Sequence, residues 1–145
     1  MPGWVDTRTF FSGGGGLWST AEDYLQFAQM LLNKGELNGT RLLGSRTVEL
    51  MASNHVDDLY AEAGTTGGRL GGRPGLGFGL TVRTVDDAVL AQDAQSTGSF
   101  GWSGAFGTTF WVDPKENLTA ILMVQTPGGP LRGDFANAVM QAIVD

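Results

Sequence analysis

The chain has 145 residues, of which 41% are hydrophobic, a length that suffices for one domain with a buried core but not for two of ordinary size. Fifteen acidic and nine basic residues give a formal net charge of −6, which excludes a surface for nucleic acid or for an anionic membrane. The absence of cysteine excludes disulfides, thiolate metal sites and a cysteine nucleophile, and the single histidine leaves no zinc-type spacing.

The ends and the apolar stretches of the chain bear on its location. Met1 to Asp6 contain neither a basic segment nor an apolar one, so we expect no secretory signal. No stretch approaches the roughly 20 apolar residues that span a bilayer. We therefore expect a single soluble domain over residues 1–145, cytoplasmic by default, without a nucleic-acid or membrane partner.

Two helices are expected in the first third of the chain. Ser19, with a glutamate three residues later, forms a capping box, and Gly35 ends the helix that follows. The apolar stripe of this helix consists of Tyr24, Leu25, Ala28, Leu31 and Leu32. A turn at Asn38-Gly39 precedes a shorter helix, which is predicted from Ser45 to about Ser53.

A long loop and then a sheet are expected next. Residues 56–77 are small, polar and rich in glycine, which predicts a long flexible loop. Alternation of apolar and other residues over Phe78–Val82 predicts a half-buried strand. Two further strands, Thr108–Val112 and Leu118–Gln125, flank a turn that contains Pro114.

The last elements complete an α+β fold. The run from Leu118 to Val124 is almost continuously apolar, which predicts a central strand covered on both faces. Asp134 is predicted to cap a closing helix, with Phe135 and Val139 on its apolar face. Helices and strands are therefore segregated along the chain, which indicates an antiparallel sheet of at least three strands with packed helices.

The segment Gly101-Trp102-Ser103-Gly104-Ala105 has three interpretations. Its glycines could let Trp102 or Trp111 pack closely against a neighbouring strand, without any chemistry. It could be a substrate-binding strand whose backbone N–H groups supply half of an oxyanion hole. Ser103 could itself be a nucleophile, since the segment nearly fits the Gly-x-Ser-x-Gly elbow, but the sequence that follows is typical of a strand and that elbow needs a helix.

Two other features carry weaker signals. His55 with Asp57 and Asp58 could supply a base and its orienting carboxylate, although a lone histidine beyond a helix end is more typical of a capping residue. Gly13 to Gly16 lack the Gly-Lys-Ser/Thr ending of a phosphate loop. We expect neither a nucleotide nor a metal cofactor.

Several motifs in order resemble the C-terminal part of the serine β-lactamase and penicillin-binding-protein-like superfamily, in particular its class C β-lactamase and family VIII carboxylesterase branch. These motifs are Phe11 to Tyr24, Phe27 to Asn33, Leu42-Leu43, Thr47 to Met51 and Gly101 to Ala105. The resemblance implies a partial β-lactamase-like or transpeptidase-like fold. It also implies a serine hydrolase of β-lactams or carboxylic esters.

The resemblance assigns a substrate-binding wall to Trp102, Ser103, Gly104 and Ala105, with the Ala105 N–H as the oxyanion donor of the sheet. Trp102-Ser103-Gly104 stands where the family has Lys-Thr-Gly, His-x-Gly or Trp-x-Gly. None of the seven serines precedes a lysine by three residues, so the Ser-x-x-Lys nucleophile motif is missing from this sequence. The Tyr-x-Asn or Tyr-x-Ser motif is missing too.

These observations lead to one functional expectation and two alternatives. We expect the chain to bind an acyl, ester or β-lactam ligand and to have little or no turnover alone, because acyl transfer needs an activated serine. One alternative is a non-catalytic oligomerising or ligand-binding module, and the other is a small esterase that uses Ser103. Because the family has further elements that complete the sheet, we also expect a homo-oligomer formed through an unpaired sheet edge.

Overall fold

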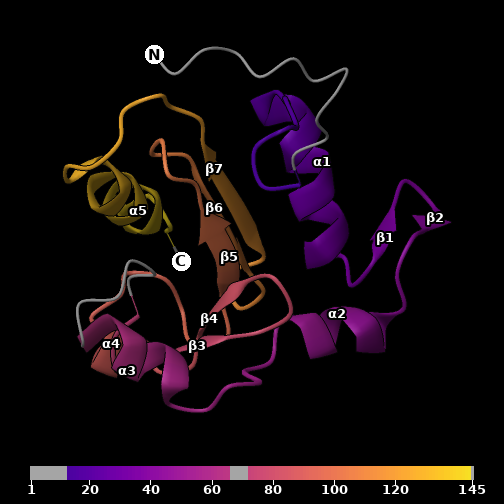
Figure 1. Ribbon diagram of the computed structural model, residues 1–145. Helices are drawn as coiled ribbons and strands as arrows, with labels where there is room; N and C mark the ends of the chain where they lie inside the picture. The colour runs from indigo at the N-terminus through magenta and orange to yellow at the C-terminus, as the bar shows by residue number, and fades with distance from the viewer. Residues whose placement is uncertain (1–12, 66–71, 145) are drawn as a thin grey trace.

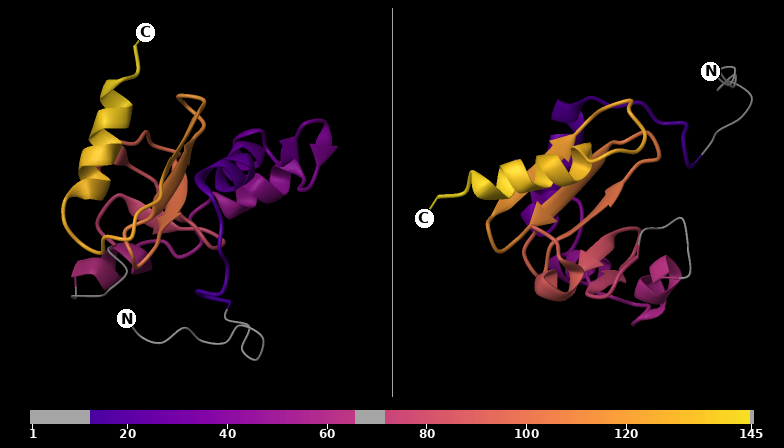
Figure 2. Two further views of the ribbon diagram at one scale, coloured as in Figure 1. Left: turned by 90° about the horizontal axis from the view of Figure 1, so that it is seen from above. Right: turned by 90° about the vertical axis from the view of Figure 1, so that its left-hand side faces the viewer.

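A computed structural model describes residues 13–65 and 72–144 of the protein (Figure 1). Among these residues, one antiparallel sheet has five strands in the order β3-β4-β5-β6-β7. The strands are β3 (Leu76–Phe78), β4 (Arg83–Val85), β5 (Phe100–Ser103), β6 (Thr109–Asp113) and β7 (Leu118–Leu122). Helices α1 (Ala21–Leu32) and α5 (Leu131–Gln141) lie on opposite faces of this sheet (Figures 1 and 2). The predicted α+β class and the minimum of three strands are confirmed.

The remaining elements surround this centre. Strands β1 (Glu36–Leu37) and β2 (Thr40–Arg41) form a short hairpin after α1, which confirms the predicted Asn38-Gly39 turn. Helix α2 (Ser45–Met51) begins at the predicted residue. Helices α3 (Leu59–Thr65) and α4 (Ala88–Ala91) lie beside β3 and β4 (Figure 1). No helix of the described residues has the length and apolar character needed to cross a bilayer.

Local signals at both ends of α1 define its length. The N-cap is Thr20, one residue after the predicted Ser19, and its hydroxyl accepts a hydrogen bond of 3.1 Å from the Asp23 N–H. After Leu32 the chain turns at Lys34 and Gly35, which have φ angles of 56° and 96°. The buried face of α1 packs on β6 and β7. Its buried residues belong to the core cluster Ala28, Met30, Leu31, Val48, Val82, Phe100, Phe110 and Val112.

The interval 56–77 is not one loop. It contains α3 and the first residues of β3, so the prediction of a continuous loop is wrong for these segments. Tyr60 of α3 is only 6% exposed, and its ring lies 5.5 Å from that of Phe78. Packing against a distant strand stabilises this helix, which lacks a strong pattern of its own. Residues 66–71 lie outside the described part, so the predicted flexibility of the segment remains a prediction.

The strand predicted over Phe78–Val82 is, after Phe78, a tight connection between two strands. β3 ends at Phe78 and β4 begins at Arg83, and these two residues are paired. The Gly79 N–H donates to the Val82 carbonyl at 2.8 Å, and Thr81 has a φ of 71°. In a half-buried strand, Leu80 and Val82 would lie on the same buried face. Leu80 is exposed while Val82 is buried, so these residues belong to a hairpin turn.

Strand β7 was predicted to be central, and it lies at the end of the strand order instead. Its apolar run has another cause, because α1 and α5 both contact it from opposite faces. The hairpin between β6 and β7 is where the sequence predicted it, around Asp113–Asn117. No strand in residues 13–65 or 72–144 pairs with the outer edge of β7.

Helix α5 begins three residues before the predicted cap. Its N-cap is Pro130, and Asp134 lies in the first turn, where a carboxylate suits the helix dipole. Phe135 packs edge-on against Trp111 of β6, with ring centroids 5.5 Å apart. This contact packs α5 against β6.

Candidate functional site

The predicted wall lies where β5 leaves the sheet. The strand ends at Ser103, and Gly104 to Gly107 form the turn into β6. The Gly104 N–H donates to the Thr108 carbonyl at 2.8 Å, and the Gly107 N–H donates to the Gly104 carbonyl at 3.2 Å. Ser103 and Ala105 are exposed, while Trp102 and Gly104 are half-buried. The segment is therefore accessible to a ligand along one side.

Ala105 presents an unused donor at this turn. Its residue is exposed, and within the described part of the chain its backbone N–H has no acceptor. A donor of this kind, on a backbone fixed by neighbouring hydrogen bonds, is what an oxyanion hole requires. The geometry is therefore compatible with the role that the family resemblance implies for this residue.

Gly101 and Trp102 point to opposite faces of the sheet. A Cβ on Gly101 would overlap the Phe110 carbonyl and would lie 2.7 Å from the Trp111 Cα, so packing of β5 on β6 explains this glycine. The Trp102 ring lies 5.3 Å from that of Phe78 in an edge-on contact, on the α1 side. Close packing thus accounts for Gly101 but not for the exposed residues that follow.

Ser103 is held by another hydroxyl and has no base beside it among the described residues. Its Oγ lies 2.9 Å from the Thr109 Oγ1, and Thr109 faces it on β6. The chain then turns into a strand, so the strand-to-helix turn of a nucleophile elbow is missing at this point. The environment of Ser103 resembles that of a wall residue more than that of a nucleophile.

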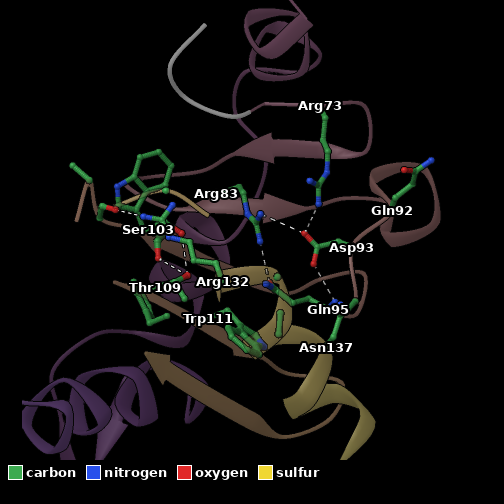
Figure 3. Close-up of a pocket in the computed structure, with 18 of the residues that line it drawn as sticks. Arg73, Arg83, Gln92, Asp93, Gln95, Ser103, Thr109, Trp111, Arg132 and Asn137 are labelled. Carbon is green, nitrogen blue, oxygen red and sulfur yellow. Dashed lines mark hydrogen bonds and ion pairs between the residues drawn. The ribbon is translucent and has the colours of Figure 1, made fainter. Parts of the chain in front are cut away.

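A cleft of about 820 Å³ opens between this turn, the sheet and α5 (Figure 3). Ser103 and Thr109 lie at one end of the cleft and Asn137 of α5 at the other, with Trp111 between them (Figure 3). Trp111 is 1% exposed, and its indole Nε1 has no hydrogen-bond partner in the described residues. The cleft is large enough for a small organic ligand or for a segment of polypeptide.

Charged side chains surround this cleft. Asp93 accepts from Arg73 at 2.9 Å and pairs with Arg83 at 3.4 Å, and Arg83 also donates to Gln95 at 3.1 Å. Burial raises the pKa of the nearby Tyr60 hydroxyl, and Arg83 and Arg73 partly offset the rise. The sequence alone did not reveal this group of charged residues, because its members are far apart in the chain and no short motif contains them.

His55 holds the chain after α2. Its Nε2 lies 2.7 Å from the Leu50 carbonyl, and its backbone N–H donates to the Phe78 carbonyl at 2.9 Å. Neither Asp57 nor Asp58 bonds to its ring in the part of the protein that the structure describes. These contacts favour the capping interpretation over a catalytic one.

Comparison with known proteins agrees with this architecture. A family model described as Beta-lactamase matches residues 1–145. The chain is 35% identical to protein Rv1367c of Mycobacterium tuberculosis, over 86% of this chain and 31% of that protein. It is 28% identical to esterase EstB of Burkholderia gladioli, over 91% of this chain and 30% of that protein.

A solved structure has the same fold. It is EstCE1, described as a hydrolase with promiscuous acyltransferase activity, which superimposes with a TM-score of 0.76 at 28% identity, over 94% of this chain and 33% of that one. The chain thus spans about a third of the length of the relatives it matches. From the match of the family model over the whole chain and from the shared fold, we conclude that this chain belongs to the Beta-lactamase family.

Proposed function

We propose that the chain binds the acyl part of a carboxylic ester or β-lactam along Ser103 to Ala105, with the Ala105 N–H donating to the carbonyl oxygen. The observation that supports this most directly is the exposed Ala105 N–H, which has no acceptor among the described residues. The names of two similar proteins, an esterase and a hydrolase with acyltransferase activity, agree with an acyl ligand.

We also propose that the chain alone has little or no turnover. In its sequence, no serine precedes a lysine by three residues, and neither tyrosine has an asparagine or serine two residues later. An oxyanion donor stabilises developing charge but cannot attack a carbonyl. The groups that activate a nucleophile would have to come from another polypeptide segment.

Binding is tested on the ¹⁵N-labelled chain by titration with benzylpenicillin and, separately, with ethyl butyrate. We expect the Ala105 amide resonance to shift in a saturable manner, because its proton gains an acceptor. Ala105→Pro removes the N–H and should abolish binding, whereas Ala105→Ser keeps it and should bind as the original chain does. If the Ala105 resonance does not shift at the highest soluble concentration of either ligand, the proposal is contradicted.

Turnover is tested with nitrocefin and a p-nitrophenyl ester. We expect rates that equal those of buffer for the original chain and for Ser103→Ala alike. A rate above buffer that disappears in Ser103→Ala would instead support the small esterase.

A second candidate is a non-catalytic module that assembles through its sheet. The observation that favours it is the outer edge of β7, which no strand of the described residues pairs. Its apolar sequence, Leu118-Thr119-Ala120-Ile121-Leu122, contains no charge or proline that would protect an edge.

A further inference from the structure

The turn that carries Ala105 is held from outside the sheet by Arg132. This arginine lies in the first turn of α5, and its Nε donates to the Gly107 carbonyl at 3.1 Å. Its Nη2 donates to the Gly104 carbonyl as well. The two bonds clamp both ends of the four-residue turn (Figure 3 shows Arg132 beside Ser103).

Other roles account poorly for an arginine at this position. A positive charge in the first turn of a helix is unfavourable for the helix dipole. Within residues 13–65 and 72–144, no carboxylate lies within ion-pair distance of Arg132, in contrast to Arg73 and Arg83. The hydrogen bonds that its guanidinium makes in the described residues go to the two carbonyls of the turn.

The contact with Gly104 acts directly on the proposed oxyanion donor. The Gly104 carbonyl and the Ala105 N–H belong to the same peptide group, which is planar and has its C=O and N–H pointing in opposite directions. Arg132 binds the carbonyl, so the N–H is directed away from the Arg132 guanidinium. A charged donor on the carbonyl also polarises the peptide, which strengthens its N–H as a donor.

We infer that Arg132 is a positioning residue, which orients and polarises the Gly104–Ala105 peptide so that the Ala105 N–H is ready to receive a carbonyl oxygen. The inference rests on the function proposed above. The position of Arg132 depends in turn on α5, whose Phe135 and Ala136 pack with Trp111 in one cluster. The helix therefore acts on the turn that carries Ala105 through the Arg132 side chain.

The test compares the Ala105 amide in the original chain, Arg132→Ala and Arg132→Lys. Without ligand, we expect Arg132→Ala to move the Ala105 amide proton upfield and to lower its backbone order parameter. Arg132→Lys should give intermediate values, because a lysine carries one compact donor group where arginine forks to two carbonyls. The matched control is Arg46→Ala, which removes an exposed arginine of α2 whose partner is Glu49.

Titration with benzylpenicillin gives the second readout. We expect Arg132→Ala to weaken binding about tenfold, a change in binding free energy similar to the net contribution of one ordinary hydrogen bond. Arg46→Ala should bind as the original chain does. Should the original chain show no binding, the proposed function fails, and the ligand-free amide data still decide the role of Arg132.

The inference itself would be overturned if Arg132→Ala and Arg132→Lys left the Ala105 shift and order parameter unchanged while only lowering thermal stability. That outcome would make Arg132 a stabilising contact and nothing more. If Arg132→Ala does not fold, as judged from its whole spectrum, the Arg132→Lys values decide.

Discussion

Asp113 is a buried carboxylate that organises one end of the sheet. It is fully buried and accepts hydrogen bonds from the backbone N–H groups of Ser96 at 3.1 Å and of Lys115 and Glu116 at 3.2 Å. These bonds join the β6–β7 turn to the segment before β5. The Asp113 side chain thus holds together two connecting segments that are separate in the sequence.

Replacement of Asp113 by alanine should lower the free energy of unfolding by about 2–4 kcal/mol, because three backbone N–H groups lose the acceptor that this buried side chain supplies. Urea denaturation followed by circular dichroism measures the loss. The matched control, Asp134→Ala, removes an exposed carboxylate from the first turn of α5 and should cost less than about 1 kcal/mol. Equal losses in the two variants would show that the hydrogen bonds of Asp113 do not contribute as described.

At the scale of elements, two glycines have different surroundings. One lies between the closely packed strands β5 and β6, and the other lies on the surface of α5. Gly101 lies against the β6 backbone, whereas nothing lies within 4 Å of the position that a Cβ on Gly133 would take. Gly133 is within α5 and is exposed. The same substitution should therefore have opposite effects at the two sites.

We expect Gly101→Ala to separate β5 from β6 and to lower the free energy of unfolding by about 2–4 kcal/mol or more, as for other steric clashes in a core. Gly133→Ala should raise it by about 0.5–1 kcal/mol, since alanine favours the helix and meets no neighbour. Thermal and urea unfolding of both variants measure the two effects. A Gly101→Ala protein as stable as the original would contradict the close packing of β5 on β6.

At the scale of the whole molecule, the described residues protect the sheet at one edge and leave the other edge without a pairing strand. α3 packs beside β3, where Tyr60 contacts Phe78. At the other edge, β7 has half-buried apolar side chains and no pairing strand among the described residues. Exposed Leu25 and Met123 add apolar surface. Such an edge is a template for another strand.

We accordingly predict that the chain self-associates through β7 at micromolar concentration. Light scattering should give a mass above that of the 15.3 kDa monomer. Thr119→Lys places a charge on the edge strand and should shift the equilibrium toward the monomer, while the exposed Arg46→Ala should leave it unchanged. A monomeric original chain would count against association and against the second candidate function.

Much of this protein could be predicted from local sequence signals. Three features depend on residues that are neighbours in the chain and could therefore be predicted: the cap at Thr20, the Asn38-Gly39 turn and the hairpin around Pro114. The cap was predicted to within one residue. The family could also be recognised from the sequence, because its motifs keep their order along the chain.

Only the tertiary structure decided the rest. Helix α3 exists because Tyr60 packs on a strand that begins 16 residues later, and β7 is apolar because two helices cover it at the edge of the sheet. The link from Arg132 to Gly104 joins residues 28 positions apart. Interactions between distant residues form when packing brings them together, and no periodicity or spacing in the sequence records them.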